Sequence, residues 1–569
     1  MGEVPASQTY LDIGQGSRGF DRIYDPTALP PFHVRRTRVA GWSRVVARAS
    51  SAPAEVVPGL LASALRRAGL AAAAAPGLGL PSLIAAGLDG RLRRTANPAR
   101  GLDVRRSSLR ELRRLVAGLR GADLLIAIER PPPSPQGALT IGIAGRGFGG
   151  DLTSDSTRMD GYVLTTDIAP TILVRLGLGV PAQMSGQPIH SQGPLDPSAV
   201  ASLGMRLAAI SSRRGPVLGA GVAIWLAALL LVIAATRGRA ARSGVRLAGL
   251  AVVYLPLVLL AGAALRPSQG AEGLLVILGA PLLGVLTLAG LGGGYRALAF
   301  ASALTVSAYV VDVIAGSPLT PLSLLGPNPG LGVRFYGIGN ELEALLAVLI
   351  IAGTGAAFAG FCPGIPGRRA ALVFLAIGAL LAFVFSAGAF GADIGAAITL
   401  PVGAAGAAVA MPSPRRRRAG AVLLVLICPF VALGLVALVD LVSGSNSHFA
   451  RSVLDTNSLE QLARVARRRL QAAAGSFVRP LLLAFMPLVL AVCAIAILHR
   501  NRLADWLHGL PAMRAGLLGA LAATVVGSVA NDSGLLFAEV GAAYLLVFTG
   551  YVWAEAGHSA VPAAQSSEP

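Results

Sequence analysis

The chain contains no lysine, and all 48 of its basic residues are arginine. This absence excludes a Walker A nucleotide site, the usual kinase site and Schiff-base chemistry, because each depends on a lysine amine. A codon preference that also enriches alanine and glycine accounts for most of the bias. Cysteine is scarce too: Cys362, Cys428 and Cys493 show no metal-binding spacing, so we expect neither a disulfide nor a zinc site.

Charge is also scarce. Only 13% of the 569 residues are charged, 54% are hydrophobic, and the mean hydropathy is +0.67. Such a chain is too apolar for one soluble domain. Residues 1–212 mix charged and apolar residues, whereas apolar runs of about 20 residues recur later, each able to cross ~30 Å of hydrocarbon as a helix. We therefore expect a globular domain at 1–212, a transmembrane domain at 213–556 and a disordered tail at 557–569.

About eleven stretches qualify as membrane spans. They are 217–236, 247–265, 273–291, 297–316, 341–361, 370–387, 394–411, 420–442, 480–498, 514–531 and 535–554. Gly388, Asp393 and Gly395 interrupt the region 370–411, which is alternatively a hairpin of two half-crossing helices. The sequence predicts an all-α polytopic bundle with a long outer loop at 444–479.

Arginine is distributed unequally between the linkers. One alternate set of linkers carries fourteen arginines and the other eight, which places the richer set in the cytoplasm. The protein is then a multi-pass plasma-membrane protein with its first domain extracytoplasmic and its C-terminus cytoplasmic. Because no signal peptide precedes that domain, either an export signal or span lies upstream of Met1 or the number of spans is not eleven, and we expect the first. The net charge of +20 could suit nucleic acid, but the arginine clusters flank spans, so we expect membrane lipids and no nucleic acid as partners.

The first domain has an α/β pattern. Residues 122–130 and 139–144 are predicted to be strands, the first of them buried in a parallel sheet, and a glycine-rich turn follows at 145–150. Helical patterns at 55–70 and 107–119 lie between candidate strands, which favours α/β layering.

A helix start follows at Thr165-Thr166-Asp167-Ile168-Ala169-Pro170-Thr171, where Thr166 or Asp167 can cap and Pro170 suits the first turn. With Met184-Ser185-Gly186-Gln187-Pro188, this segment resembles the late part of the alkaline phosphatase/sulfatase superfamily, over roughly residues 120–190. The resemblance implies an alkaline phosphatase-like fold, which is incomplete here. Alternatively, Asp167 and Pro170 have no functional role and only form a helix cap.

The resemblance does not bring the family's active site. Its enzymes hold divalent metal through Asp and His and attack with Ser, Thr or a modified Cys. Here 143–149 offers no ligand where the family has Asp-His-Gly, and Ser7 or Thr9 near the nucleophile position shows no activating partner. We therefore expect a domain that binds or scaffolds without hydrolysis. The cofactor is unknown, and a divalent metal is expected only if an upstream segment restores the site.

Polar residues gather at the span ends assigned to the outer side. Charges at bilayer depth cost about 2.5 kcal/mol or more each, so several on one side suggest a shared polar cavity. The candidate catalytic residues are Glu341, Asp393, Glu539 and His448. The candidate substrate-binding residues are Arg334, Tyr336, Asn340, Arg464, Arg467, Arg468, Asn531 and Asp532.

Two local patterns support these choices. Glycines in 332–341 permit close backbone approach, and the amides of the next helix favour an anion. Leu459 to Ala474 forms a basic amphipathic pattern suited to the headgroup layer, and its arginines suit phosphate. The stretch 531–534 taken alone is typical of an ordinary polar loop, and a lone histidine such as His448 is more often structural.

Three functions remain open. The first is an enzyme of the bacterial cell envelope, transferase-like or hydrolase-like, acting at the outer leaflet on a polyprenyl-phosphate or other lipid-linked phosphate or glycan, with a carboxylate as base. The second is a transporter or flippase that uses the same carboxylates as cation or proton sites. The third is a non-catalytic scaffold, which ranks last because an anchor needs only one span. Polar residues collected at one face favour the first.

Overall fold

The computed structural model describes residues 4–18, 29, 31–52, 55–93, 100–132, 137–236, 238–327, 329, 334–412, 420, 423, 425, 427–434, 486–531 and 533–556. Their contacts form two compact units, and the boundary falls between Ala209 and Ile210 within the long helix α6 (Pro197–Ala235). Arg334 and Phe335, which come much later in the sequence, group with the first unit.

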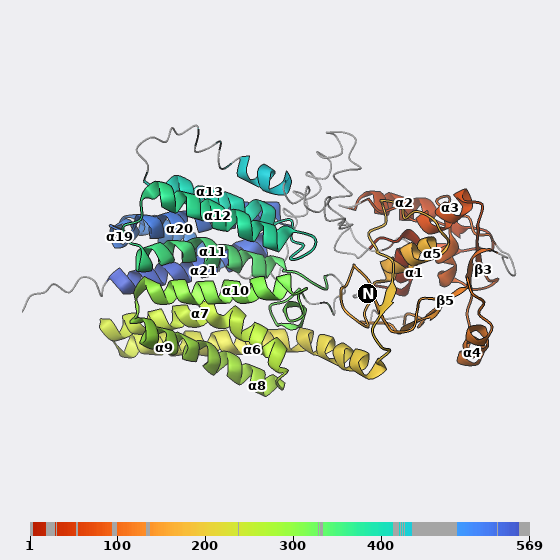
Figure 1. Ribbon diagram of the computed structural model, residues 1–569, viewed down its shortest axis with the longest axis horizontal. Coiled ribbons are helices and arrows are strands. Elements are labelled where there is room, and N and C mark those ends of the chain that lie inside the picture. Colours follow the sequence, from red (N-terminus) through yellow and green to blue (C-terminus); the bar gives the residue numbers. More distant parts are fainter. Residues whose placement is uncertain are drawn as a thin grey trace, which may run out of the picture. The chain divides into compact units, whose positions relative to one another are not determined.

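The first unit combines short helices with small sheets (Figure 1). Its helices are α1 (Ala6–Gln15), α2 (Trp42–Ser50), α3 (Leu60–Arg67), α4 (Leu109–Ala117) and α5 (Ile168–Arg175), with 3-10 turns at Leu80–Ala85 and Thr165–Asp167. The strands pair as β1 (His33–Val34) with β2 (Val39–Ala40), β3 (Ala71–Ala74) with β4 (Gly101–Val104), β5 (Leu124–Ile128) with β6 (Ile141–Gly145), and β7 (Asp151–Thr153) with β8 (His190–Gln192). Only β3 and β4 are parallel.

One strand prediction is wrong in its pairing. β5 and β6 lie where strands were expected, but they form an antiparallel hairpin, with Leu124 opposite Gly145 and Ile128 opposite Ile141. β5 is half-buried rather than buried within a larger parallel sheet. The chain returns directly from one strand to the other, which antiparallel pairing permits, whereas parallel pairing needs a crossover. The small sheets are not clearly an alkaline phosphatase-like fold.

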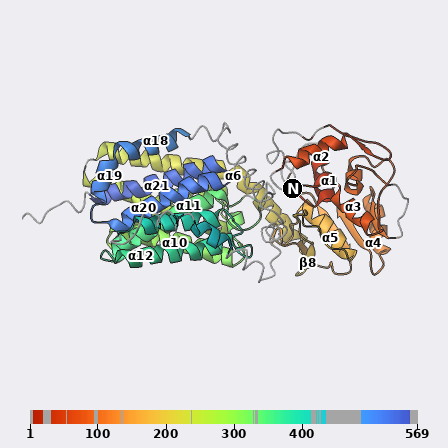
Figure 2. The ribbon, with the colours of Figure 1, turned by 90° about the horizontal axis from the view of Figure 1, so that it is seen from above.

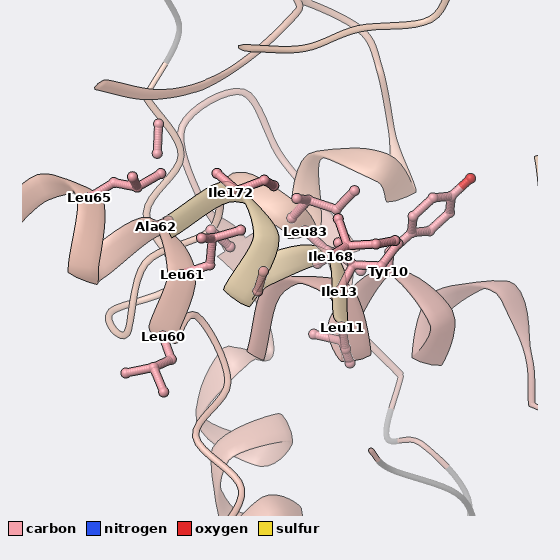
Figure 3. Close-up of a cluster of buried hydrophobic side chains, with 14 of the residues drawn as sticks. Tyr10, Leu11, Ile13, Leu60, Leu61, Ala62, Leu65, Leu83, Ile168 and Ile172 are labelled. Carbon is pink, nitrogen blue, oxygen red and sulfur yellow. The ribbon is translucent and has the colours of Figure 1, made fainter. Parts of the chain in front are cut away.

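The core of the first unit collects apolar side chains from distant parts of the chain (Figure 3). Ile13 of α1, Leu61 of α3, Leu83 and Ile168 are each at most 3% exposed. Burying each such side chain contributes about 1.5–3 kcal/mol. The short helices are therefore held by this shared core, since helices this short are marginal in isolation.

The second unit is a bundle of long apolar helices. Eight segments of the described chain are long and apolar enough to cross a membrane, and they confirm eight of the expected spans. They are α6, α7 (Arg239–Leu265), the segment Gln269–Leu291, α10 (Gly294–Ile314), α11 (Asn340–Phe361), α12 (Gly367–Ser386), α20 (Pro511–Ala530) and α21 (Gly534–Ala556). Gln269–Leu291 consists of α8 (Gln269–Leu274), a π-helical turn at Leu275–Gly279 and α9 (Ala280–Leu291).

The other three expected spans are either too short to cross a membrane or lie partly outside the described residues. The stretch 394–411 forms α13 (Ala396–Ala410), whose 15 residues extend only about 22 Å, so it does not cross alone. Its neighbour α12 has 20 residues, so the hypothesis of two half-crossing helices is wrong for α12. Most of 420–442 and part of 480–498 lie outside the described residues. The described part of the latter is α18 (Met486–Leu498), which α19 (Arg500–Trp506) follows.

Small residues let the central helices approach closely. α20 packs against both α11 and α13, as two views of the bundle also show (Figures 1 and 2). A Cβ added to Gly516 of α20 would lie 3.1 Å from the Cα atom of Gly355 in α11, and Gly519 meets the backbone of Gly403 in α13. Glycine at such contacts is typical of helices that pack inside a membrane.

One end of the bundle is rich in arginine contacts. Arg246 Nη1 lies 3.0 Å from Glu555 Oε1, and Arg296 Nε donates to the carbonyl of Gly360 at 2.8 Å. Tyr551 donates to the carbonyl of Gly294 at 3.0 Å. The arginine-bearing linkers before α7, α10 and α12 thus meet at one end together with the end of α21. Which side of the membrane this end faces stays a prediction.

Candidate functional site

At the opposite end, a buried carboxylate and a buried amide join three helices. Asn531, just after α20, donates from Nδ2 to Glu343 Oε2 of α11 at 3.0 Å. A Cβ on Gly395, at the start of α13, would lie 2.5 Å from Asn531 Oδ1 and 2.6 Å from Glu343 Oε2. Glu343 is 1% exposed and Asn531 is 6% exposed. We call Glu343, Asn531 and Gly395, with the buried Thr399 one turn further along α13, the three-helix site.

Asp393 stands at the edge of the three-helix site and starts α13. Its Oδ1 accepts a hydrogen bond from the backbone N–H of Gly395 at 3.2 Å, and its carbonyl accepts from Ala396. A carboxylate in this position caps the first helical turn and favours the positive end of the helix dipole. Asp393 is 3% exposed, so it is held inside the protein rather than presented to a large substrate.

Glu539 of α21 is a third buried carboxylate, 6% exposed. Its Oε1 accepts no hydrogen bond from any residue that the structure describes. Asp312 of α10 provides a contrast: its two oxygens accept from the amides of Leu319 and Thr320, both at 2.9 Å, and from the Thr320 hydroxyl. Asp312 therefore holds a turn in place, whereas Glu539 keeps an oxygen for another partner.

The glycine-rich segment before α11 lies against the loop before α13. The Ile338 amide donates to the carbonyl of Gly391 at 3.3 Å, and a Cβ on Gly337 would collide with that carbonyl. Gly337 also has a positive φ of 73°, which side chains other than glycine rarely adopt. This close backbone approach fixes the loop that carries Asp393 beside the start of α11.

Glu341 lies in the first turn of α11, half-buried, close enough to Arg214 of α6 for a favourable charge interaction. Arg214 also donates to the carbonyl of Gly326. Tyr336 and Asn340 flank the same turn and are half-buried. These groups differ from the three-helix site, because solvent still reaches them.

The expected site residues are therefore brought together only in part. Asn531 joins the three-helix site with Asp393 at its edge, and Glu341, Asn340 and Tyr336 occupy the neighbouring turn. Arg334 belongs to the other compact unit. His448, Arg464, Arg467, Arg468 and Asp532 lie outside the described residues. Sequence reasoning missed Glu343 and Thr399 as site residues.

In the first unit, Asp167 is used to hold backbone segments together. Its Oδ1 accepts from the Ser156 hydroxyl at 2.6 Å and the Gln187 amide at 2.9 Å, and its Oδ2 accepts from the Ser154 hydroxyl at 2.7 Å and the Leu164 amide at 2.9 Å. Burial raises the pKa of Asp167, and the four hydrogen bonds oppose that rise. This arrangement supports the interpretation of Asp167 as a cap.

The family's nucleophile position is no clearer in the structure. Ser7 and Thr9 both lie in α1, where Thr9 is buried and its hydroxyl donates to the carbonyl of Pro5 at 3.5 Å. Within the described residues, no group of three or more His, Cys, Asp or Glu side chains is placed to hold a metal ion. Of the side chains that define the three-helix site, Glu343 is a carboxylate, whereas Asn531 and Thr399 are neutral. No protein-family model, curated protein or solved structure matches the chain.

Proposed function

We propose that the protein is a carrier or flippase of the plasma membrane that moves a lipid-linked phosphate or glycan, driven by a cation or proton bound at the three-helix site. The observation that carries this proposal is the burial of three carboxylates within the bundle. Glu343, Asp393 and Glu539 are each at most 6% exposed. A small ion can reach such groups, whereas a lipid-linked substrate needs an open surface.

The shape of α13 supports the same proposal. It begins inside the bundle after an irregular stretch at 387–395 and is too short to cross alone. Interrupted helices whose ends meet buried polar groups are typical of ion-coupled transporters. The arginine bias of the linkers supports an orientation in which the three-helix site lies at the extracytoplasmic end and the first unit lies outside.

The second candidate is a transferase-like or hydrolase-like enzyme at the outer leaflet. Glu341 favours it, because this carboxylate is half-buried beside Arg214 at the start of a helix. A phosphate could meet the arginine and the helix amides while the carboxylate acts as base. The phosphatase-like first unit would bind the acceptor without hydrolysing it.

A flipping assay separates the two. The full chain is reconstituted in liposomes with a polyprenyl-phosphate that carries a dithionite-sensitive fluorophore, and bleaching of the inner-leaflet pool is followed. We expect dithionite to bleach more than the half of the fluorophore that lies in the outer leaflet. Glu343→Gln should abolish the additional bleaching. Asp505→Asn, whose exposed carboxylate is in α19, should retain it. Release or transfer of phosphate that requires Glu341, without flipping, would favour the enzyme instead.

A further inference from the structure

Several Ser and Thr hydroxyls of the described membrane helices bond a backbone carbonyl, and that of Thr305 donates to the carbonyl of Val253 in α7 at 3.0 Å. In six membrane helices a Ser or Thr hydroxyl donates to the carbonyl four residues earlier, as Thr354 does to Ile350 at 2.7 Å and Thr524 does to Ala520 at 2.9 Å. Thr399 does not: its Oγ1 has no hydrogen-bond partner among the described residues, although Thr399 is 0% exposed. Leaving a buried hydroxyl without a partner costs about 1–3 kcal/mol.

The contacts of α13 show which way Thr399 faces. Four residues before it, Gly395 meets Asn531 and Glu343, and four residues after it, Gly403 meets Ala523 of α20 and Ile351 of α11. Residues four apart share one helix face, so Thr399 also faces α11 and α20. Side chains on a helix lean toward its N-terminus, and the turn N-terminal to Thr399 is the one whose Gly395 lies against Glu343 and Asn531.

We propose that the three-helix site binds sodium through the Thr399 hydroxyl, the Glu343 carboxylate and the Asn531 side-chain carbonyl. Hard cations prefer oxygen ligands of these kinds. Of these three ligands only Glu343 carries a charge, so the set matches a monovalent ion better than a divalent one. A cation would bind the carboxylate and also engage the Thr399 hydroxyl, which has no hydrogen-bond partner among the described residues. The inference rests on the proposed function in one respect: both take the three-helix site as the place where the driving ion binds.

Binding to the folded state stabilises it by an amount that grows with the logarithm of ligand concentration above Kd, so sodium should raise the unfolding temperature. The full chain in lipid nanodiscs is unfolded thermally in sodium chloride, potassium chloride or choline chloride at constant ionic strength and pH. We expect an upward shift that grows with sodium concentration, is smaller in potassium and is absent in choline.

Three variants sharpen the test. Thr399→Val removes the hydroxyl without changing the shape of the side chain, so it should lose the sodium shift. In choline it should unfold at a higher temperature than the wild type, because it removes an unsatisfied buried polar group. Glu343→Gln should also lose the shift. Thr354→Val, whose hydroxyl bonds only its own helix, should keep it. Lack of a sodium shift in the wild type, or its persistence in Thr399→Val, overturns the inference.

The stability measurement and the flipping assay can fail separately. A protein that flips lipid through Glu343 without any sodium shift would keep the proposed function and lose the sodium site. A sodium shift abolished by Thr399→Val in a protein that moves no lipid would keep the site and lose the function.

Discussion

Replacing Asp167 tests whether this carboxylate is structural. In Asp167→Ala the amides of Leu164 and Gln187, both partly buried, lose their acceptor. Each unsatisfied amide costs about 1–3 kcal/mol, so the pair costs about 2–6 kcal/mol even if both serine hydroxyls find other partners. A domain is typically stable by only about 5–15 kcal/mol. We therefore expect the first unit of Asp167→Ala to unfold at a much lower temperature than that of the wild type.

Proteolysis of the purified full chain after short heating steps measures this loss, because the cleavage of the first unit can be followed by fragment size. Asp167→Asn should fall between the alanine variant and the wild type, since it keeps one oxygen acceptor and replaces the other with a donor. Asp155→Ala is the control, because that side chain is exposed close to the same turn. If Asp167→Ala resists protease like the control, the carboxylate does not hold the fold, and a role in binding or catalysis becomes the better explanation.

Two further changes probe opposite ends of the bundle. Gly395→Ala should break the bond between Asn531 and Glu343 and lower the unfolding temperature, because its Cβ would lie 2.5 Å from Asn531 Oδ1. Gly290→Ala in α9 is the control and should leave the unfolding temperature unchanged, because a Cβ there meets nothing within 4 Å. Equal unfolding temperatures of the two variants would refute the geometry. At the arginine-rich end, Glu555→Gln should lower the unfolding temperature, because it removes the negative charge whose Oε1 lies 3.0 Å from Nη1 of the half-buried Arg246. A double-mutant cycle with Arg246→Gln should recover part of the loss. Additive losses in that cycle would contradict a direct pair.

The spans were the most predictable part of the fold. In lipid every backbone amide must bond within its own segment, so a long apolar run has to be a helix. The helix can still extend beyond the apolar run, as α6 does toward Pro197. The exception, 394–411, shows the limit of that argument. This stretch is apolar enough to span a membrane, but Asp393 caps a new helix within it. The residues before Asp393 contact Gly337 instead of extending that helix.

The first unit was harder, because strand pairing depends on partners far along the chain. The sequence identified β5 and β6 as strands from their composition, yet an apolar strand gives no sign of whether its neighbour runs parallel or antiparallel. The helix cap at Asp167 was predictable, since the Thr-Asp-x-x-Pro pattern acts within one turn. The serine hydroxyls that hold its carboxylate come from 154–156, and no local pattern marks them.

Glu341 and Glu343 show why the candidate site was found only in part. The two lie in one helical turn, and α11 is apolar on every side, so its composition does not tell which of them faces inward. Steps of four residues from Glu343 lead to Ala347, Ile351 and Gly355, and the last two contact α13 and α20. Small residues at that spacing mark the face that packs against other helices. The same step from Glu341 reaches Leu345 and Leu349, so the stripe of alanine and glycine was the available signal that Glu343, rather than Glu341, enters the three-helix site.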